Sequence, residues 1–295
     1  MKFNSAKVGM LAAMGIFGTV GIFVRYIPLA SATIAFFRGL VGLLFLLAVM
    51  ALSGKKPDWK QIRENGILLL ISGAAMGANW ILLFEAYRYT TVAIATICYY
   101  LAPMLLVLAS PLLGEKLTVK KLALSVLAMV GMVFVSGVLR GGMRGGRGIL
   151  CGVSAAVLYA SVMFLNKKLG AVSSYDRTIV QLAAAAAVIL PYCLLSSGFD
   201  MSGMTGGGYL ALAVVCIVHT GIAYWLYFGS IKQLSAQTVA IFSYLDPVVA
   251  IFLSALWLFE PVGWQDIVGA VLILGSALVS ELPMQKSSGN FSKKG

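Results

Sequence analysis

Two charged side chains interrupt long apolar segments of this sequence. Asp246 lies beside Pro247 in one such segment, and Arg38 lies well inside another. A charge at the centre of a bilayer costs roughly 2.5–3.5 kcal/mol on insertion scales, so each needs a partner or a role. Asp246 could contact a substrate amine or carry a proton, or it could accept bonds at the proline break or pair with an arginine. Arg38 could bind a carboxylate, reach the headgroups or pair with Asp246.

Hydroxyl-bearing aromatic residues form a second pattern. Thr96, Tyr99, Tyr100 and Pro103 follow the spacing i, i+3, i+4, i+7, which places them on one face of a helix. Such a face suits a cavity wall that stacks against and hydrogen-bonds a small solute. Ordinary helix packing with satisfied hydroxyls is the alternative. By the same reasoning, the further cavity candidates are Asn79, Trp80, Tyr159, Tyr224 and Tyr244.

His219 is the only histidine, and the four cysteines are isolated from one another. A histidine with a reference pKa near 6.5 could relay a proton, or it could be a hydrogen-bonded packing residue. The sequence contains neither a CxxC pair nor a Cys/His cluster, so it predicts no metal site. It also lacks a GxxxxGK[ST] loop. We therefore expect no cofactor and no ATP-driven step.

Composition indicates where these residues lie. Hydrophobic residues make up 60% of the chain and charged residues 11%, against about 45–50% and 25% in soluble proteins. The charges cluster between apolar runs, which is typical of a protein that crosses the membrane several times. The net charge of +12 fits the positive-inside rule and does not indicate nucleic-acid binding.

Apolar runs long enough to span a bilayer occur ten times. The first five lie near 8–25, 31–52, 66–86, 91–113 and 118–139, and the second five near 148–166, 176–197, 207–228, 236–258 and 264–283. The fold class is therefore an all-α membrane protein. A linker at 140–147 separates the two sets, and a polar tail covers 284–295.

The distribution of basic residues predicts the orientation. With the N-terminus in the cytoplasm, every lysine, together with Arg63 and Arg177, falls at the inner side. Only five arginines fall outside, at positions 25, 88, 140, 144 and 147. The positive-inside rule therefore favours both termini in the cytoplasm. Because each set holds an odd number of spans, the second set would insert upside down relative to the first.

The two sets also share a motif. Tyr99-Tyr100-Leu101-Ala102-Pro103 precedes Gly114-Glu115, and Tyr244-Leu245-Asp246-Pro247 precedes Glu260-Pro261, with the two prolines 144 residues apart. With this pattern, the chain resembles the EamA family of the drug/metabolite transporter superfamily over residues 8–283. The resemblance implies ten helices in two inverted repeats, 8–139 and 148–283. It also implies transport, often export, of amino acids, nucleotide precursors or other small polar metabolites.

The resemblance bears on individual positions as well. It implies that Glu115 and Glu260 are structural, holding their turns or binding the N-terminal amides of the following helix, and we treat Pro103 and Pro247 as structural too. The family commonly carries Glu before the second proline and Gly before the later Glu; here these positions are Asp246 and Phe259. Asp keeps the charge, but the departure weakens any inference about the substrate.

We therefore expect a secondary carrier of the cell membrane, with a small metabolite and the lipid bilayer as its partners. A monomer and a homodimer both remain open. An intramembrane enzyme is an alternative, but such enzymes need clustered catalytic groups, and the sequence predicts no catalytic residue. A channel is the other alternative. It would require a continuous polar path, whereas the polar stripes here are confined to the middle of the spans.

Overall fold

The computed structural model describes residues 5–90, 92–135, 145–196, 198–257 and 263–281, and within them every regular element is helical. The first half of the chain contains α1 (Ser5–Val24), α2 (Ser31–Leu52), α3 (Trp59–Glu64), α4 (Gly66–Tyr89), α5 (Val92–Tyr99), α6 (Leu101–Ala109), the 3₁₀ helix η1 (Ser110–Leu113) and α7 (Val119–Val135). The second half contains α9 (Gly146–Lys168), α10 (Ser174–Ser196), α11 (Gly206–Cys216), the π-helix η2 (Ile217–Ile222), α12 (Ala223–Ile231), α13 (Ala236–Phe242), α14 (Leu245–Trp257) and α15 (Trp264–Glu281).

Seven helical stretches of the described chain are long and apolar enough to cross a membrane. They are Ser5–Val24, Ser31–Leu52, Gly66–Tyr89, Ile94–Leu113, Gly146–Lys168, Ser174–Ser196 and Gly206–Ile231, and a shorter apolar helix covers Trp264–Ser280. The expected spans at 118–139 and 236–258 are not among the seven. The helix of the first is described only to Val135, and the second divides into α13 and α14.

Three of the expected continuous runs are interrupted. The run at 91–113 breaks at Tyr100, and the run at 236–258 breaks at Ser243 and Tyr244. Each break falls three or four residues before a proline, because a proline ring lacks an N–H and clashes with the carbonyl four residues earlier. The third run, 207–228, contains the π-helix η2. None of the three interruptions was predicted from the sequence.

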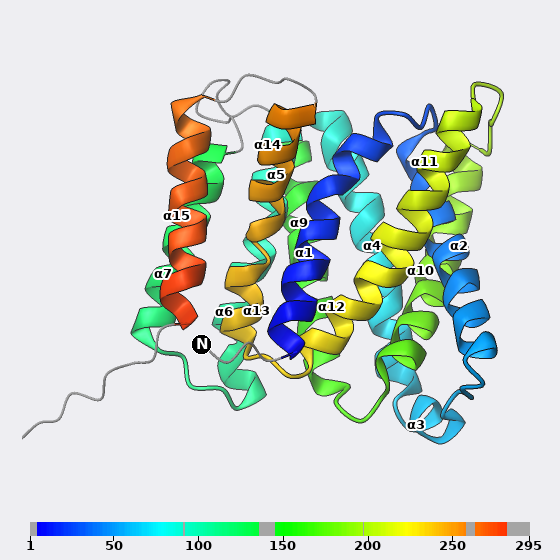
Figure 1. The fold of residues 1–295 in the computed structure, drawn as a ribbon, viewed down its shortest axis with the longest axis horizontal. Helices are drawn as coiled ribbons and strands as arrows, with labels where there is room; N and C mark the ends of the chain where they lie inside the picture. The colour runs from blue at the N-terminus through cyan, green and yellow to red at the C-terminus, as the bar shows by residue number, and fades with distance from the viewer. Residues whose placement is uncertain (1–4, 91, 136–144, 197, 258–262, 282–295) are drawn as a thin grey trace, which may run out of the picture.

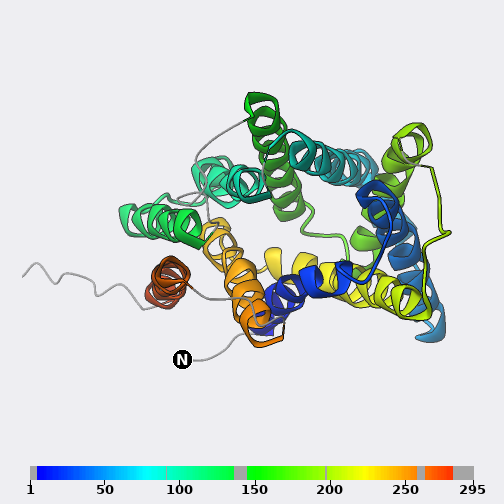
Figure 2. The ribbon, with the colours of Figure 1, turned by 90° about the horizontal axis from the view of Figure 1, so that it is seen from above.

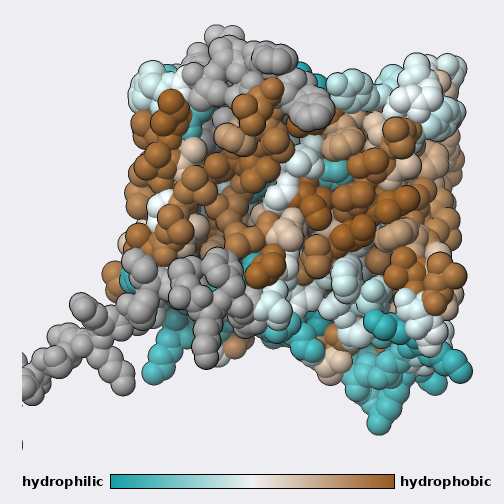
Figure 3. All heavy atoms as spheres, in the orientation of Figure 1, coloured by the Kyte–Doolittle hydropathy of each residue, from teal (hydrophilic) through white to brown (hydrophobic). Residues whose placement is uncertain are grey.

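The helices stand roughly side by side and surround the middle of the molecule when seen from above (Figures 1 and 2). α7 and α15 pack against each other at one side. A band of apolar side chains covers the visible wall, with polar residues at the end of the molecule where α3 lies (Figure 3). We call this end, where α1 begins and the α6–α7, α9–α10 and α12–α13 connections lie, the basic end.

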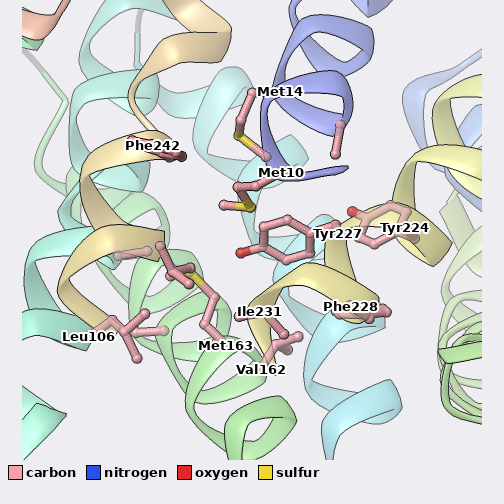
Figure 4. Close-up of a cluster of buried hydrophobic side chains, with 14 of the residues drawn as sticks. Met10, Met14, Leu106, Val162, Met163, Tyr224, Tyr227, Phe228, Ile231 and Phe242 are labelled. Atoms are coloured by element: carbon pink, nitrogen blue, oxygen red, sulfur yellow. The ribbon is translucent and has the colours of Figure 1, made fainter. Parts of the chain in front are cut away.

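Apolar side chains from several helices form a buried layer near the basic end. Met10 and Met14 of α1 face Met163 of α9, Leu106 of α6 and Ile231 of α12 (Figure 4). All five are at most 2% exposed. Methionine is flexible and fills irregular gaps between helices. This apolar layer can therefore stay closely packed when the helices shift slightly.

Candidate functional site

The two proline breaks meet in space. Tyr100 and Tyr244 occupy equivalent positions of the repeated motif, and their rings stack with centroids 6.0 Å apart. The Tyr244 hydroxyl donates to the backbone carbonyl of Tyr100 at 3.0 Å. It also lies within hydrogen-bonding reach of the Met104 amide. A break in one half is therefore held by a side chain from the break in the other half.

Asp246 completes this junction. Its carboxylate accepts a hydrogen bond from the Tyr100 hydroxyl, so the bond crosses from α14 to the α5–α6 break. α1 passes close by, since a Cβ at Gly18 would lie 2.6 Å from the Asp246 carbonyl oxygen. Tyr244 is fully buried, whereas Tyr100 and Asp246 keep accessible surface.

A line of aromatic rings leads away from this junction. Tyr99 meets Tyr100 edge to face and stacks on Tyr159 of α9, with centroids 5.1 Å apart and planes 2° from parallel. The Tyr159 hydroxyl bonds the Tyr227 hydroxyl at 3.3 Å. Tyr227 in turn meets Tyr224 edge to face. Tyr227 was not among the cavity candidates predicted from the sequence.

Arg38 lies at the other end of this line. Its guanidinium lies 4.8 Å from the centre of the Trp80 ring, and its Nε donates to the Thr220 hydroxyl at 3.1 Å. The Trp80 ring lies 6.0 Å from that of Tyr224. Among the described residues Arg38 makes no ion pair, so the possible pairing with Asp246 is not what the structure contains. The two charges instead mark opposite ends of an aromatic surface.

His219 lies in η2, and its ring contacts hydrogen-bonding groups of α1 and α11. Its Nε2 lies 2.6 Å from the Thr19 hydroxyl, and its Nδ1 lies 3.3 Å from the Val214 carbonyl. Both ring nitrogens therefore have partners. π-Helical turns are rare and often occur at functional positions. This π-helical turn contains both His219 and Thr220, the hydrogen-bond partner of Arg38.

The remaining predicted residues on the first half of the chain include Asn79 in α4 and Thr96 in α5. Asn79 is 1% exposed, and its Oδ1 has no hydrogen-bond partner among the described atoms. Thr96 hydrogen-bonds Tyr87. The expected single face of Thr96, Tyr99, Tyr100 and Pro103 is interrupted, because the helix breaks at Tyr100. Pro103 itself is buried in α6, and Pro247 is buried in α14.

Glu115 is bound differently from the expectation. One carboxylate oxygen accepts from the Ala236 amide at 2.7 Å, and the other pairs with Lys167 at 2.9 Å. Glu115 thus caps α13 of the second half, whereas the sequence analysis expected it to act on its own turn or the following helix. The matching Glu260 lies outside the described residues, as do most of the linker and the polar tail.

Several buried polar groups were not found by the sequence analysis. Arg177 is fully buried and donates to the carbonyls of Asn166, Leu169, Val172 and Phe228, so it ties the end of α9 to α12. Gln181 bonds both Ser72 and Asn166. Asn166 therefore belongs to a network that joins α4, α9 and α10.

A second polar cluster that was not predicted from the sequence joins α4 and α10. Glu85 accepts from the Tyr192 hydroxyl and pairs with Arg88 at 2.8 Å. A pocket of about 300 Å³ lies beside it, lined by Tyr192, Arg88 and the start of α2. An acid three residues before a basic residue in an apolar run was the signal available in the sequence.

The described residues contain no group of three or more His, Cys, Asp or Glu side chains that could hold a metal ion. The arrangement instead offers one carboxylate, one guanidinium and the aromatic rings between them. These groups can bind and orient a small solute by charge, stacking and hydrogen bonds.

Comparison with known proteins agrees with a membrane transporter. The chain is 31% identical to the uncharacterized transporter YxxF of Bacillus subtilis (strain 168), over 93% of this chain and 89% of that protein. It is 25% identical to an uncharacterized transporter of Archaeoglobus fulgidus, over 95% and 97% of the two chains. Protein PecM of Dickeya dadantii is 25% identical over 72% of each.

Structure and family comparisons extend along the same length. One solved crystal structure shares the fold with a TM-score of 0.85 and 20% identity, covering 94% of this chain and 96% of its own. The model of the EamA-like transporter family matches residues 5–137 and again residues 146–281. The chain therefore belongs to the EamA-like transporter family.

Proposed function

We propose that this protein is a secondary carrier that moves small metabolites across the cell membrane by alternating access. The observation that carries the proposal is the junction of Tyr100, Tyr244 and Asp246. It joins two helix breaks at equivalent positions of the two halves and holds the half-buried Asp246 at the start of α14, where its carboxylate accepts from Tyr100. Broken helices around a mid-membrane polar site are typical of secondary transporters.

The architecture we propose is ten spans in two inverted repeats of five, 8–139 and 148–283. The double match of the family model supports it. So do the helix breaks, since Tyr100 and Tyr244 lie 144 residues apart, as do Pro103 and Pro247. In this arrangement α5 and α6 form one span, as do α11 with α12 and α13 with α14.

We place both termini in the cytoplasm. The connections at the basic end carry Lys60, Lys116, Lys168 and Lys232, which supports a cytoplasmic basic end under the positive-inside rule.

The substrate we propose is an amino acid or a related polar or amphipathic solute, moved outward. Asp246 would contact its amine and Arg38 its carboxylate, with Trp80, Tyr224, Tyr99 and Tyr159 against its apolar part. The separation of the two charges by an aromatic surface supports this assignment. Because no nucleotide site is expected, an ion gradient, exchange or the substrate's own gradient would supply the energy.

The experiment is a metabolite screen by thermal shift on the purified protein, since a ligand stabilises the state that it binds. Each hit is then tested for uptake in proteoliposomes. We expect saturable, counterflow-sensitive uptake of at least one hit. Covalent alteration of a hit would instead support an intramembrane enzyme, and unitary currents in a planar bilayer would support a channel. Either result would contradict the carrier.

A further inference from the structure

A polar cluster at the basic end links the two halves of the chain. Glu115 lies in the turn before α7, Lys167 lies near the end of α9, and Ala236 is the first residue of α13. The Glu115 carboxylate holds the other two, at 2.9 Å from Lys167 Nζ and 2.7 Å from the Ala236 amide. A single side chain of the first half therefore restrains two elements of the second.

Neighbouring bonds cross between the halves in the same place. Lys121 Nζ donates to the hydroxyl of Ser235, the N-cap of α13, at 3.1 Å. Gln237 Nε2 donates to the Ser110 hydroxyl at 3.0 Å and to the Lys116 carbonyl at 3.1 Å. We call these contacts of Glu115, Lys121 and Gln237 the basic-end lock.

The apolar layer lies between this lock and the aromatic residues of the candidate site. Along α9, Tyr159, Met163 and Lys167 follow one another at intervals of four residues, so they lie on one face about 6 Å apart. Tyr159 belongs to the site, Met163 to the apolar layer and Lys167 to the lock. Met163 is fully buried together with Met10, Leu106 and Ile231 (Figure 4).

We propose that the basic-end lock and this apolar layer form the gate of the carrier at the basic end, and that the structure is the state closed at that end. The inference rests on the proposed carrier function. A gate of this kind must hold the two halves of the chain together in the closed state by hydrogen bonds and ion pairs that water can replace in the open state. The Glu115 side chain meets this condition because it is 22% exposed, so its partners can be solvated as the halves separate. Glu115 and Lys167 are positioning residues in this scheme.

The test measures access to the site from each side of the membrane. In full-length protein with its four cysteines replaced by serine, Ser243→Cys places a reporter thiol beside Tyr244 at the junction. A membrane-impermeant thiol reagent is then added from either side of oriented proteoliposomes. Glu115→Gln removes the ion pair while keeping an acceptor for the Ala236 amide. Lys232→Gln, an exposed position in the connection between α12 and α13, is the matched control.

We expect Glu115→Gln and Lys167→Gln to raise the labelling rate from the basic end at least threefold, and Lys232→Gln to leave it unchanged. Equal rates in all three variants would overturn the gate. This result is independent of transport: if the unaltered protein moved no solute, the carrier proposal would fail while the labelling pattern still reported the gate.

A second measurement closes the gate instead of loosening it. A short bifunctional thiol reagent would bridge Ser110→Cys and Gln237→Cys, whose native side chains are in contact. The reagent is one that forms a disulfide with each thiol, so that dithiothreitol removes the bridge. We expect the bridged protein to lose transport and to recover it after this reduction. Full transport by completely bridged protein would contradict the gate even if the labelling experiment supported it.

Discussion

The Tyr100 hydroxyl donates a hydrogen bond to the Asp246 carboxylate, and this bond joins the two halves of the chain at their helix breaks. Tyr244 makes the reciprocal contact by donating to the Tyr100 carbonyl. The two tyrosines are equivalent in the repeated motif, but they bind unlike partners. One bonds an ionisable side chain and the other bonds backbone, so one contact can respond to a solute while the other maintains the break.

Asp246→Asn should reduce transport at least tenfold, which corresponds to about 1.4 kcal/mol in kcat/KM. The substitution keeps the shape and an acceptor for Tyr100 but removes the charge that would bind an amine or a proton. Initial uptake rates in proteoliposomes measure the effect. Asp200→Asn is the control, because Asp200 is exposed in the loop after α10. Unchanged uptake by Asp246→Asn at equal protein levels would remove Asp246 from the site.

Tyr244→Phe should lower stability, since it leaves the Tyr100 carbonyl without its donor in a buried location. A lost buried hydrogen bond costs about 1–3 kcal/mol, although measured values within membranes are often nearer 0.6 kcal/mol. The thermal unfolding midpoint in detergent measures it, with Tyr209→Phe, an exposed position in α11, as the control. Equal midpoints for the two variants would show that the inter-half bond contributes little.

Arg38→Lys should raise KM for a carboxylate-bearing substrate severalfold with a smaller change in kcat. Lysine retains the charge, but it lacks both the planar face that lies over Trp80 and the Nε that bonds Thr220. Arg38→Gln should be more severe. Arg63→Gln in the exposed helix α3 serves as the control. If Arg38→Lys instead matched the unaltered protein in KM, a structural role for Arg38 would be favoured.

Gly18→Ala should destabilise the protein by about 1–3 kcal/mol, the usual cost of overpacking. Its Cβ would lie 2.6 Å from both the Asp246 carbonyl oxygen and the Val249 Cβ, so α1 would be pushed away from α14. Gly15→Ala in the same helix is the matched control, because nothing lies within 4 Å of a Cβ there. Thermal unfolding compares the two, and similar midpoints would indicate that α14 adjusts freely.

Much of the fold was predictable because its signals are local. Apolar runs of sufficient length indicate spanning helices wherever they occur. The helix breaks could also have been predicted, because Pro103 and Pro247 each remove a donor and crowd the carbonyl four residues earlier. The sequence analysis used these prolines only to recognise the repeat. The model of the EamA-like transporter family matches residues 5–137 and 146–281.

The candidate site could be predicted only as a set of residue types. Tyr100, Asp246 and Arg38 were identifiable because polar side chains are costly inside a bilayer. Their partners were not, since pairing depends on how helices from the two halves meet. Arg38 bonds Thr220 rather than Asp246. Arg177, interpreted from its charge as lying at the inner edge, is fully buried and ties α9 to α12.

Taken by itself, the sequence determined that the chain is a membrane protein with a repeated Tyr-Leu-x-Pro motif, because hydropathy and spacing are local properties. Only the tertiary structure decided which of two residues at equivalent positions of the two halves lies against a neighbouring helix. Gly131 and Gly275 are 144 positions apart, yet a Cβ at Gly131 would lie 2.8 Å from the Gly269 carbonyl oxygen while one at Gly275 would meet nothing within 4 Å. Glu115 likewise caps α13 in the opposite half. Such contacts arise from the packing of the two halves against each other, and spacing along the chain does not specify that packing.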